Sequence, residues 1–218
     1  MVIKSKWVLR ALALTGFAIL ATADWNEPAP ADVVGALARE ATTDDALPAA
    51  VADGLNEAQL LPDSARLLRR EGDLRHFVRH YVATNADGEL CIIAVMAAAD
   101  GGDVANAKCA RPSDVRDHGL PLRLRTGDTA TFAVLVPDGY ESARRSDGRG
   151  QIKVTNNVVS VDASAGARLP HDVVLQPQRL GDHAIQVPVR QQGQPQEGSY
   201  QLGDSEPVAG ARDRAAPP

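Results

Sequence analysis

Cys91 and Cys109 are the two cysteines of this 218-residue chain, and they stand eighteen positions apart. In an exported protein, two cysteines and no third most simply form one intrachain disulfide. There is no Cys-x-x-Cys pair for redox chemistry, and two cysteines alone do not make a zinc site. A catalytic cysteine is the alternative, but a nucleophile midway along a buried strand is hard for a substrate to reach. We therefore predict that the two sulfurs are bonded.

His76 and His80 stand four residues apart, which on a helix is a spacing that suits two metal ligands. On a strand, at about 3.3 Å per residue, the two side chains share one face but lie roughly 13 Å apart. That separation is too large for a shared metal with bonds near ~2 Å. Because this segment has strand character, we expect two exposed strand histidines and no metal. A helix through this region would reverse the prediction.

His118 is the candidate acid–base residue, with Asp117 or Asp114 as its carboxylate partner. Three serines are candidate nucleophiles, namely Ser142, Ser146 and Ser160. Single residues of such common types occur by chance, and a catalytic triad is identified by geometry that a sequence does not show. The competing interpretation of His118 is a histidine at the end of a short helix. The sequence therefore names His118 and Asp117 only as weak candidates.

Motifs with a known catalytic mechanism are absent from the chain. It has no Gly-x-Ser-x-Gly, His-Glu-x-x-His, Walker or Gly-x-Gly-x-x-Gly motif. The stretch Asp100-Gly-Gly-Asp103 lacks the ligand series and the bidentate glutamate of a calcium loop, so we interpret it as a turn. No cofactor and no metal site is predicted.

The elements that must position these residues centre on one hairpin. Phe77 to Val82 is rich in β-branched and aromatic residues, which are typical of strands. The turn Asn85-Ala86-Asp87-Gly88 tolerates left-handed conformations. Leu90 to Met96 is apolar at both odd and even positions, which predicts a strand covered on both faces at the centre of the sheet.

The N-terminus has the pattern of a secretory signal peptide over residues 1–23. A basic beginning precedes an apolar run from Ala11, and small residues at Ala21 and Ala23 fit a cleavage site. The run is shorter than the roughly 20 residues of a spanning helix. We therefore expect a secreted or extracytoplasmic protein, with an uncleaved membrane anchor as the alternative.

The charge of the chain argues against nucleic acid as its partner. The chain has 23 basic and 28 acidic residues, and the first 23 residues hold three of the basic ones and none of the acidic ones. The remainder therefore carries a net charge of −8, which repels a polyanion. Membrane contact is expected only if the N-terminal segment is retained.

The segment 32–72 is predicted to consist of short helices. Asp32 is placed to cap a helix that carries Val33, Val34 and Leu37. Further short helices are expected at Ala49 to Leu60 and at Asp63 to Glu71, the latter ending at Gly72. Three arginines of that last helix are interpreted as its solvated face, namely Arg66, Arg69 and Arg70.

Beyond Cys109, short strand candidates follow one another about every ten residues, after a helical turn at Ser113 to His118. Leu120 to Arg125 alternates apolar and polar residues, Thr129 to Val136 is β-branched, and Asn156-Asn157 separates the last two strands. Such spacing predicts a mainly β (α+β) fold, a small antiparallel sandwich or barrel with short N-terminal helices.

The predicted organisation has six parts. They are a signal peptide (1–23), a linker (24–31), a short helical segment (32–72), a disulfide-bridged β domain (73–164), a loose extension (165–190) and a disordered tail (191–218). Apolar alternations at His171 to Gln176 and Ala184 to Val189 predict edge strands in the extension, whereas the Gln-, Pro- and Gly-rich tail lacks core-forming residues.

A resemblance follows from several motifs taken together. The order Gly-Glu-Leu-Cys-Ile-Ile-Ala-Val, a glycine-rich turn, Ala-Lys-Cys-Ala, Asp-His-Gly-Leu, Ala-Val-Leu-Val-Pro-Asp-Gly-Tyr and Asn-Asn-Val-Val-Ser-Val resembles an uncharacterised family of small exported proteins of high-GC Gram-positive bacteria. The resemblance covers about Asp63 to Asp162. It implies export, a disulfide and a β-rich domain, and it assigns no catalytic residue.

Two classes of function follow from these observations. The first is an exported non-catalytic domain that binds a protein or cell-envelope component. The second is a small extracellular hydrolase with a histidine–carboxylate site, and a membrane-anchored regulator is a third option if the leader is kept. A pocket in which a histidine and a carboxylate converge would favour the enzyme.

Overall fold

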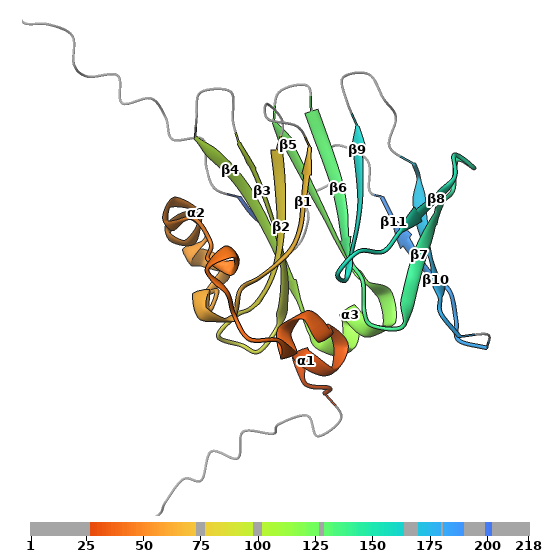
Figure 1. Ribbon diagram of the computed structural model, residues 1–218, viewed down its shortest axis with the longest axis horizontal. Coiled ribbons are helices and arrows are strands. Elements are labelled where there is room, and N and C mark those ends of the chain that lie inside the picture. Colours follow the sequence, from red (N-terminus) through yellow and green to blue (C-terminus); the bar gives the residue numbers. More distant parts are fainter. Residues whose placement is uncertain are drawn as a thin grey trace, which may run out of the picture.

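The chain folds into three antiparallel sheets stacked side by side, with a helical layer outside the first (Figure 1). The computed structural model describes residues 27–72, 77–97, 102–126, 129–163, 170–179, 181–189 and 199–201. The predicted antiparallel sandwich with short N-terminal helices is confirmed. The layers follow in the order helices, five-stranded sheet, three-stranded sheet and four-stranded sheet. The three-stranded sheet is therefore the middle sheet, and it is buried on both faces.

Each sheet has a defined strand order. The five-stranded sheet runs β1 (Arg66–Gly72), β2 (Phe77–Thr84), β3 (Leu90–Ala97), β4 (Asp103–Ala110) and β12 (Ser199–Gln201). The three-stranded sheet runs β5 (Leu120–Thr126), β6 (Thr129–Leu135) and β9 (Val158–Ala163). The four-stranded sheet runs β11 (Ile185–Pro188), β10 (Asp172–Pro177), β7 (Tyr140–Arg145) and β8 (Gln151–Lys153).

The helices are all short. The α-helices are α1 (Pro30–Val33), α2 (Ala49–Gly54) and α3 (Pro112–His118), and 3-10 turns cover Gly35–Ala38, Thr43–Asp45, Asn56–Ala58 and Pro62–Ser64. Within the ranges given above, no helix is long and apolar enough to cross a membrane. Pro30 occupies the first turn of α1 and Asp32 lies inside that helix, so the prediction that Asp32 caps the helix is wrong.

β3 is the central strand of its sheet, as its sequence predicts. Leu90, Ile92 and Met96 face the core between the five- and three-stranded sheets. Ile93 and Val95 point the opposite way, into a second cluster that includes side chains of the helical layer. A strand covered on both faces buries apolar residues at successive positions, which explains its uninterrupted apolar run.

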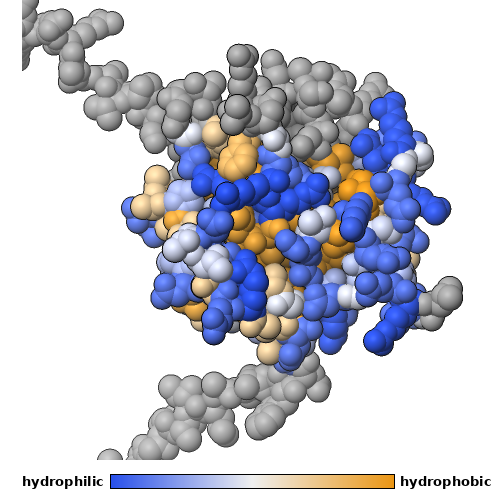
Figure 2. All heavy atoms as spheres, viewed as in Figure 1, coloured by the Kyte–Doolittle hydropathy of each residue, from blue (hydrophilic) through white to orange (hydrophobic). Residues whose placement is uncertain are grey.

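The middle sheet divides its side chains between two cores. Along β6, Ala133 and Leu135 face the five-stranded sheet, while Phe132 and Val134 face the four-stranded sheet. The apolar patches that appear between polar side chains in Figure 2 lie on a face where the layers are seen edge-on. Apolar area buried between the layers stabilises the fold by about 25 cal/mol per Å².

Cys91 and Cys109 form a disulfide, as predicted. The two residues are direct cross-strand partners in the β3–β4 ladder, and their Cα atoms are 4.0 Å apart. The bridge therefore joins two strands that the backbone ladder already aligns over eight residue pairs. An oxidising, extracytoplasmic compartment is consistent with this bond.

The helix predicted over Asp63 to Glu71 is a strand for most of its length. A 3-10 turn ends at Ser64, and β1 then pairs with β2 from Arg66 to Gly72, with a bulge between Leu67 and Arg69. Adjacent Leu67 and Leu68 fit a helical stripe, but pairing with β2 satisfies the backbone and buries Leu68 in the core instead. Long-range pairing thus overrides the local pattern, and the helical segment does not extend to residue 72.

The C-terminal part differs from the prediction in two places. β10 is an inner strand between β11 and β7, so of the two predicted edge strands β11 alone lies at an edge of the sheet. Ser199–Gln201 of the predicted disordered tail form β12, which extends the first sheet beside β4. The remainder of the tail lies outside the described residues, as do Asp100 and Gly101 of the predicted turn, whereas Asp103 begins β4.

Asn156 and Asn157 form the tight turn between β8 and β9, and both have positive φ, 46° and 62°. The Nδ2 of Asn157 donates to the carbonyl of Val136 (3.1 Å) and to Asp138 (2.6 Å). Replacing Asn157 with alanine should lower the free energy of unfolding by about 2 kcal/mol, because alanine is strained at positive φ and the hydrogen bonds are lost. Urea denaturation measures this change.

Asn157→Gly is the matched control, because glycine adopts positive φ without strain and removes the same side-chain bonds. It should lose only about 1 kcal/mol. Equal losses in the two variants would show that backbone conformation at this turn contributes nothing.

Candidate functional site

His118 and Asp117 are the last two residues of α3, and both are exposed. The Nδ1 of His118 lies 3.3 Å from the carbonyl oxygen of Asp114, within its own helix. The carboxylate of Asp117 instead accepts a hydrogen bond from Arg116 at 2.9 Å. That bond lowers the pKa of Asp117. The two candidate residues are therefore neighbours that do not form an acid–base pair.

The other candidate partners of His118 are also engaged elsewhere. Asp114 pairs with Arg111 at 3.2 Å. Each candidate serine has a different neighbour: Ser142 accepts a bond from Gln151, Ser146 from the amide of Asp172, and Ser160 lies 3.4 Å from Thr131. None of these contacts joins a serine to a histidine. They therefore do not form the serine–histidine–carboxylate triads that the sequence suggested.

His80 lies in β2, as predicted, but the prediction that it is exposed is wrong. Its side chain is completely buried, because it shares the face of Val78 and Val82 that packs between two sheets. His76 lies outside the described residues. Within the part of the chain that the structure describes, no group of three His, Cys, Asp or Glu residues is arranged to hold a metal ion.

His118 lines a cleft of about 250 Å³ that α3, β4, β5, β6 and β11 enclose. We call it the His118 cleft. Its polar lining includes the basic side chains of Lys108 and Arg123. The complete lining comprises Lys108, His118, Gly119, Pro121, Arg123, Phe132, Gln186, Val187 and Pro188. Among these described residues none is acidic, so the cleft unites basic groups with an apolar wall.

Strand register places the two cations at this cleft. Arg123 is the cross-strand partner of Phe132, so both lie on the face of the middle sheet that packs toward β11. Lys108 is the partner of Ile92, and it therefore stands on the inward face of β4. Both basic residues are partly buried. They approach from different sheets, fifteen positions apart in the chain.

Fixed neighbours hold the walls of the His118 cleft. Asn106 of β4 donates a 2.7 Å hydrogen bond to the carbonyl of Arg123, which links the two sheets beside the cleft. Gln186 donates to Asp172 at 2.8 Å, which holds its amide group in place. Gly119 ends α3 at φ 67°, and an added Cβ would lie 3.2 Å from Val134. The His118 cleft is thus closely packed at Gly119.

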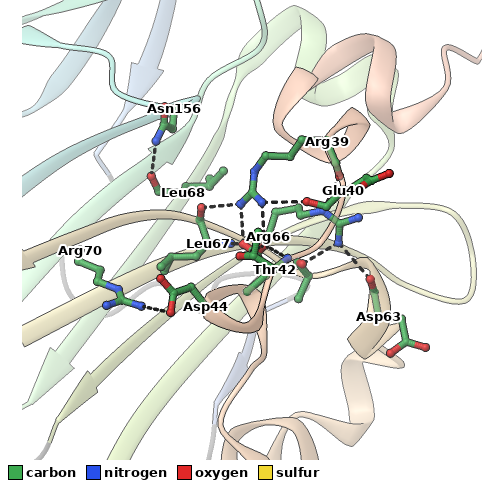
Figure 3. A network of polar contacts seen from close by, with 12 residues as sticks. Arg39, Glu40, Thr42, Asp44, Asp63, Arg66, Leu67, Leu68, Arg70 and Asn156 are labelled. Carbon is green, nitrogen blue, oxygen red and sulfur yellow. Dashed lines mark hydrogen bonds and ion pairs between the residues drawn. The ribbon is translucent and has the colours of Figure 1, made fainter.

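A second cleft, of about 470 Å³, lies between the N-terminal segment and the β8–β9 turn. Its polar centre is a network around Asp45, which is 2% exposed (Figure 3). The carboxylate accepts two bonds from Arg39, at 2.7 and 2.5 Å, and one from the amide of Leu67 at 2.6 Å. Thr42 donates through both its amide and its hydroxyl.

The network around Asp45 closes the edge of the first sheet. Arg39 donates to the carbonyl of Leu67, and Asn156 donates to the carbonyl of Leu68, so β1 has backbone groups bonded to side chains on its open side. Hydrogen bonding by Arg39 holds the pKa of Asp45 well below its usual range. The polar groups of this second cleft bond to one another, so we assign them a structural role and not a ligand-binding one.

The arginines predicted on a helix face belong to this edge strand. Arg70 pairs with Asp44, and Arg69 pairs with Glu71. Arg66 donates to the carbonyl of Arg39. Salt bridges and backbone contacts therefore occupy them, and charged groups along an open strand oppose pairing with other chains.

Sequence reasoning found His118 but missed Lys108 and Arg123. The alternation of Leu120 to Arg125 placed Arg123 on the face opposite Leu122 and Leu124, which was the available signal. The predicted cleavage residues Ala21 and Ala23 lie outside the described residues. Comparison of the chain with protein-family models, curated proteins and solved structures finds no match.

Proposed function

We propose that this protein is exported and acts outside the cytoplasm as a non-catalytic module that binds a protein or cell-envelope component. The observation that carries the proposal is the lining of the His118 cleft, where basic side chains meet an apolar wall. Ligand sites typically combine an apolar lining with a few placed polar groups. The disulfide and the leader-like N-terminus support the extracytoplasmic location.

The alternative of a small hydrolase has weaker support. A histidine base requires its orienting carboxylate and a nucleophile within hydrogen-bond reach. Asp117 is bonded to Arg116, and the described residues that line the cleft with His118 include neither an acid nor a serine. Binding is therefore the function that the geometry supports best.

A sedimentation assay tests the binding role. The full gene is expressed in a high-GC Gram-positive host, the chain is purified from the medium, and its mass shows whether it begins at Asp24. The purified chain is then sedimented with washed cell envelopes at increasing concentration. We expect saturable binding that unlabelled chain displaces. Binding that rises linearly, without displacement, would contradict the proposal.

Substitution of His118 provides a separate prediction. His118→Ala should leave ester, peptide and glycoside hydrolysis by the purified chain at the buffer background, as in the unsubstituted chain. Chromogenic substrates of the three classes measure this. Activity in the original chain that falls at least tenfold in His118→Ala, but not in the exposed-histidine control His171→Ala, would support the hydrolase instead.

A further inference from the structure

We propose that the outer edge of β4 docks an extended peptide strand of a protein partner, which takes the place of β12. This inference rests on the binding function proposed above and names the partner's segment, a strand longer than β12 with one apolar side chain for the His118 cleft. Three observations carry it, namely the short strand that occupies the edge, the direction of the backbone groups of β4, and the position of the cleft beside the edge.

β12 shows what the edge accepts. Its three residues, Ser199–Gln201, pair antiparallel with Lys108, Ala107 and Asn106 of β4. On its other side, β4 pairs with β3 over all eight of its residues. Within the described residues, no strand pairs with the outer side of the rest of β4, at 103–105 and 109–110. A longer strand would therefore form more main-chain hydrogen bonds than β12 does.

The distance across the disulfide shows which backbone groups of β4 point outward. Residues opposite each other in an antiparallel ladder alternate between hydrogen-bonded pairs, with Cα atoms about 5.5 Å apart, and non-hydrogen-bonded pairs, at about 4.5 Å. The Cα atoms of Cys91 and Cys109 are 4.0 Å apart, so these two residues form a non-hydrogen-bonded pair. The amide and carbonyl of Cys109 therefore point away from β3, and those of Ala105 and Ala107 do so by alternation. β12 places a residue opposite Ala107, whereas no described strand residue lies opposite Ala105 or Cys109 on this side.

β4 lacks features by which edge strands avoid pairing with other chains. Its ladder with β3 runs without a bulge, and it contains no proline. At β1, the opposite edge of the same sheet, the side chains of Arg39 and Asn156 bond to backbone carbonyls. The fold thus closes one edge of this sheet with side chains and covers the other with a short strand.

The His118 cleft lies beside this edge and provides a pocket for one side chain. Lys108, which lines the cleft, faces the middle sheet, and cross-strand partners share one face of a sheet. The residue that pairs with Lys108 therefore lies on the cleft side of the docked strand. Phe132, Val187 and Pro121 offer this residue an apolar wall, and the volume of about 250 Å³ suits one side chain such as leucine. Since this wall makes the contact, no charge of the cleft is required.

A partner strand fits the edge better than a second copy of the chain. Exchange of β12 between two copies would form the same bonds again, without gain. Direct pairing of two β4 edges would bring together two chains that each carry a net charge of −5. Because β12 belongs to the same chain, it has a high effective concentration at β4. A partner strand offsets this advantage through additional main-chain bonds and an apolar side chain in the cleft.

Nuclear magnetic resonance titration of the ¹⁵N-labelled exported chain tests the proposal. The probe is an acetylated and amidated octapeptide with the sequence of residues 197–204, in which leucine replaces Ser199 and threonine replaces both glycines. We expect saturable shifts at the amides of Ala105, Ala107 and Cys109. The same peptide with an N-methyl group on its tyrosine lacks the donor that faces Ala107, so it should bind at least tenfold more weakly. Alanine in place of the leucine should weaken binding at least threefold, because the cleft is then left unfilled.

Substitution within β12 examines whether the peptide takes its place. Tyr200→Pro removes the amide that faces Ala107 and prevents pairing of β12, so the peptide should bind this variant at least threefold more tightly. Val208→Pro, which adds a proline beyond β12, should change the affinity less than twofold. Spectral dispersion verifies folding of each variant.

Several outcomes would overturn the proposal. They are equal binding of the N-methylated or the alanine peptide, shifts confined to β1, and equal affinity of Tyr200→Pro and the original chain. Dimerisation of Tyr200→Pro without peptide, measured by analytical ultracentrifugation, would assign the edge to a second copy of the chain and would overturn the proposal as well.

The outcomes for strand docking and for the binding role are separable. Saturable envelope binding without any titration of the peptide overturns strand docking and leaves the binding role intact. Peptide binding at β4 supports strand docking even where envelope sedimentation fails.

Discussion

Replacing Asp45 with alanine is expected to lower the free energy of unfolding by about 3 kcal/mol. The carboxylate is 2% exposed and accepts bonds from Arg39, Thr42 and Leu67. Its removal leaves the amide donors of Thr42 and Leu67 without their acceptor and removes the bonds by which Asp45 joins the N-terminal segment to β1. Urea denaturation of both chains at pH 7 measures the loss.

Asp44→Ala is the matched control, since Asp44 is the adjacent acid and its side chain is 72% exposed. Exposed ion pairs contribute about 0–1 kcal/mol, so this change should be small. A loss in Asp45→Ala no larger than that in Asp44→Ala would disprove the structural role of the network.

The same carboxylate should make stability depend on pH. Because Arg39 lowers the pKa of Asp45 in the folded state, the folded chain binds its proton less readily than the unfolded chain, whose pKa is about 3.9. Its contribution is therefore complete above that value and is lost as the pH falls below it. Unfolding free energy between pH 6 and pH 3 should fall more in the original chain than in Asp45→Asn. Parallel curves would exclude this linkage.

Loss of the disulfide is the second large effect that we expect. The double variant Cys91→Ala, Cys109→Ala should be less stable by about 3 kcal/mol, because the bridge closes a loop with a sequence separation of 18. The β3–β4 ladder aligns the same residues independently of the bond. The variant should therefore keep its far-ultraviolet circular dichroism while its denaturation midpoint falls.

Reductant provides the control for the disulfide prediction. Dithiothreitol should shift the original chain to the midpoint of the double variant and should leave the double variant unchanged. Without reductant, a thiol reagent should label neither cysteine in the native chain. Labelling of both would show that the sulfurs are not bonded.

The local sequence pattern was sufficient to predict a strand that is buried on both faces and a turn whose backbone conformation favours a particular residue type. Leu90 to Met96 is apolar at both odd and even positions because both faces of β3 are covered, so the burial of this strand can be predicted from the sequence. The turn at Asn156 and Asn157 is similarly evident, because asparagine tolerates positive φ. The fold class, the disulfide and most strands followed from such signals.

Errors arose where a distant partner decides the conformation. Leu67 and Leu68 satisfy a helical stripe as well as a bulged strand, and only pairing with β2 selects the strand. His80 was expected to be exposed because the sequence does not show that a second sheet covers its face. The His118 cleft is a similar case, since Lys108 and Arg123 meet through the packing of two sheets rather than through spacing.

The N-terminal segment completes the structure only after distant parts of the chain exist. The amide of Gly35 donates to Asp138, 103 positions later, and Glu27 accepts bonds from Ser113, 86 positions later. During synthesis Glu27 and Gly35 emerge before these partners, because Ser113 lies in α3 and Asp138 follows β6. A nascent chain stalled before residue 138 lacks the Gly35–Asp138 hydrogen bond, so its N-terminal segment should be cleaved by proteases faster than that of the full chain.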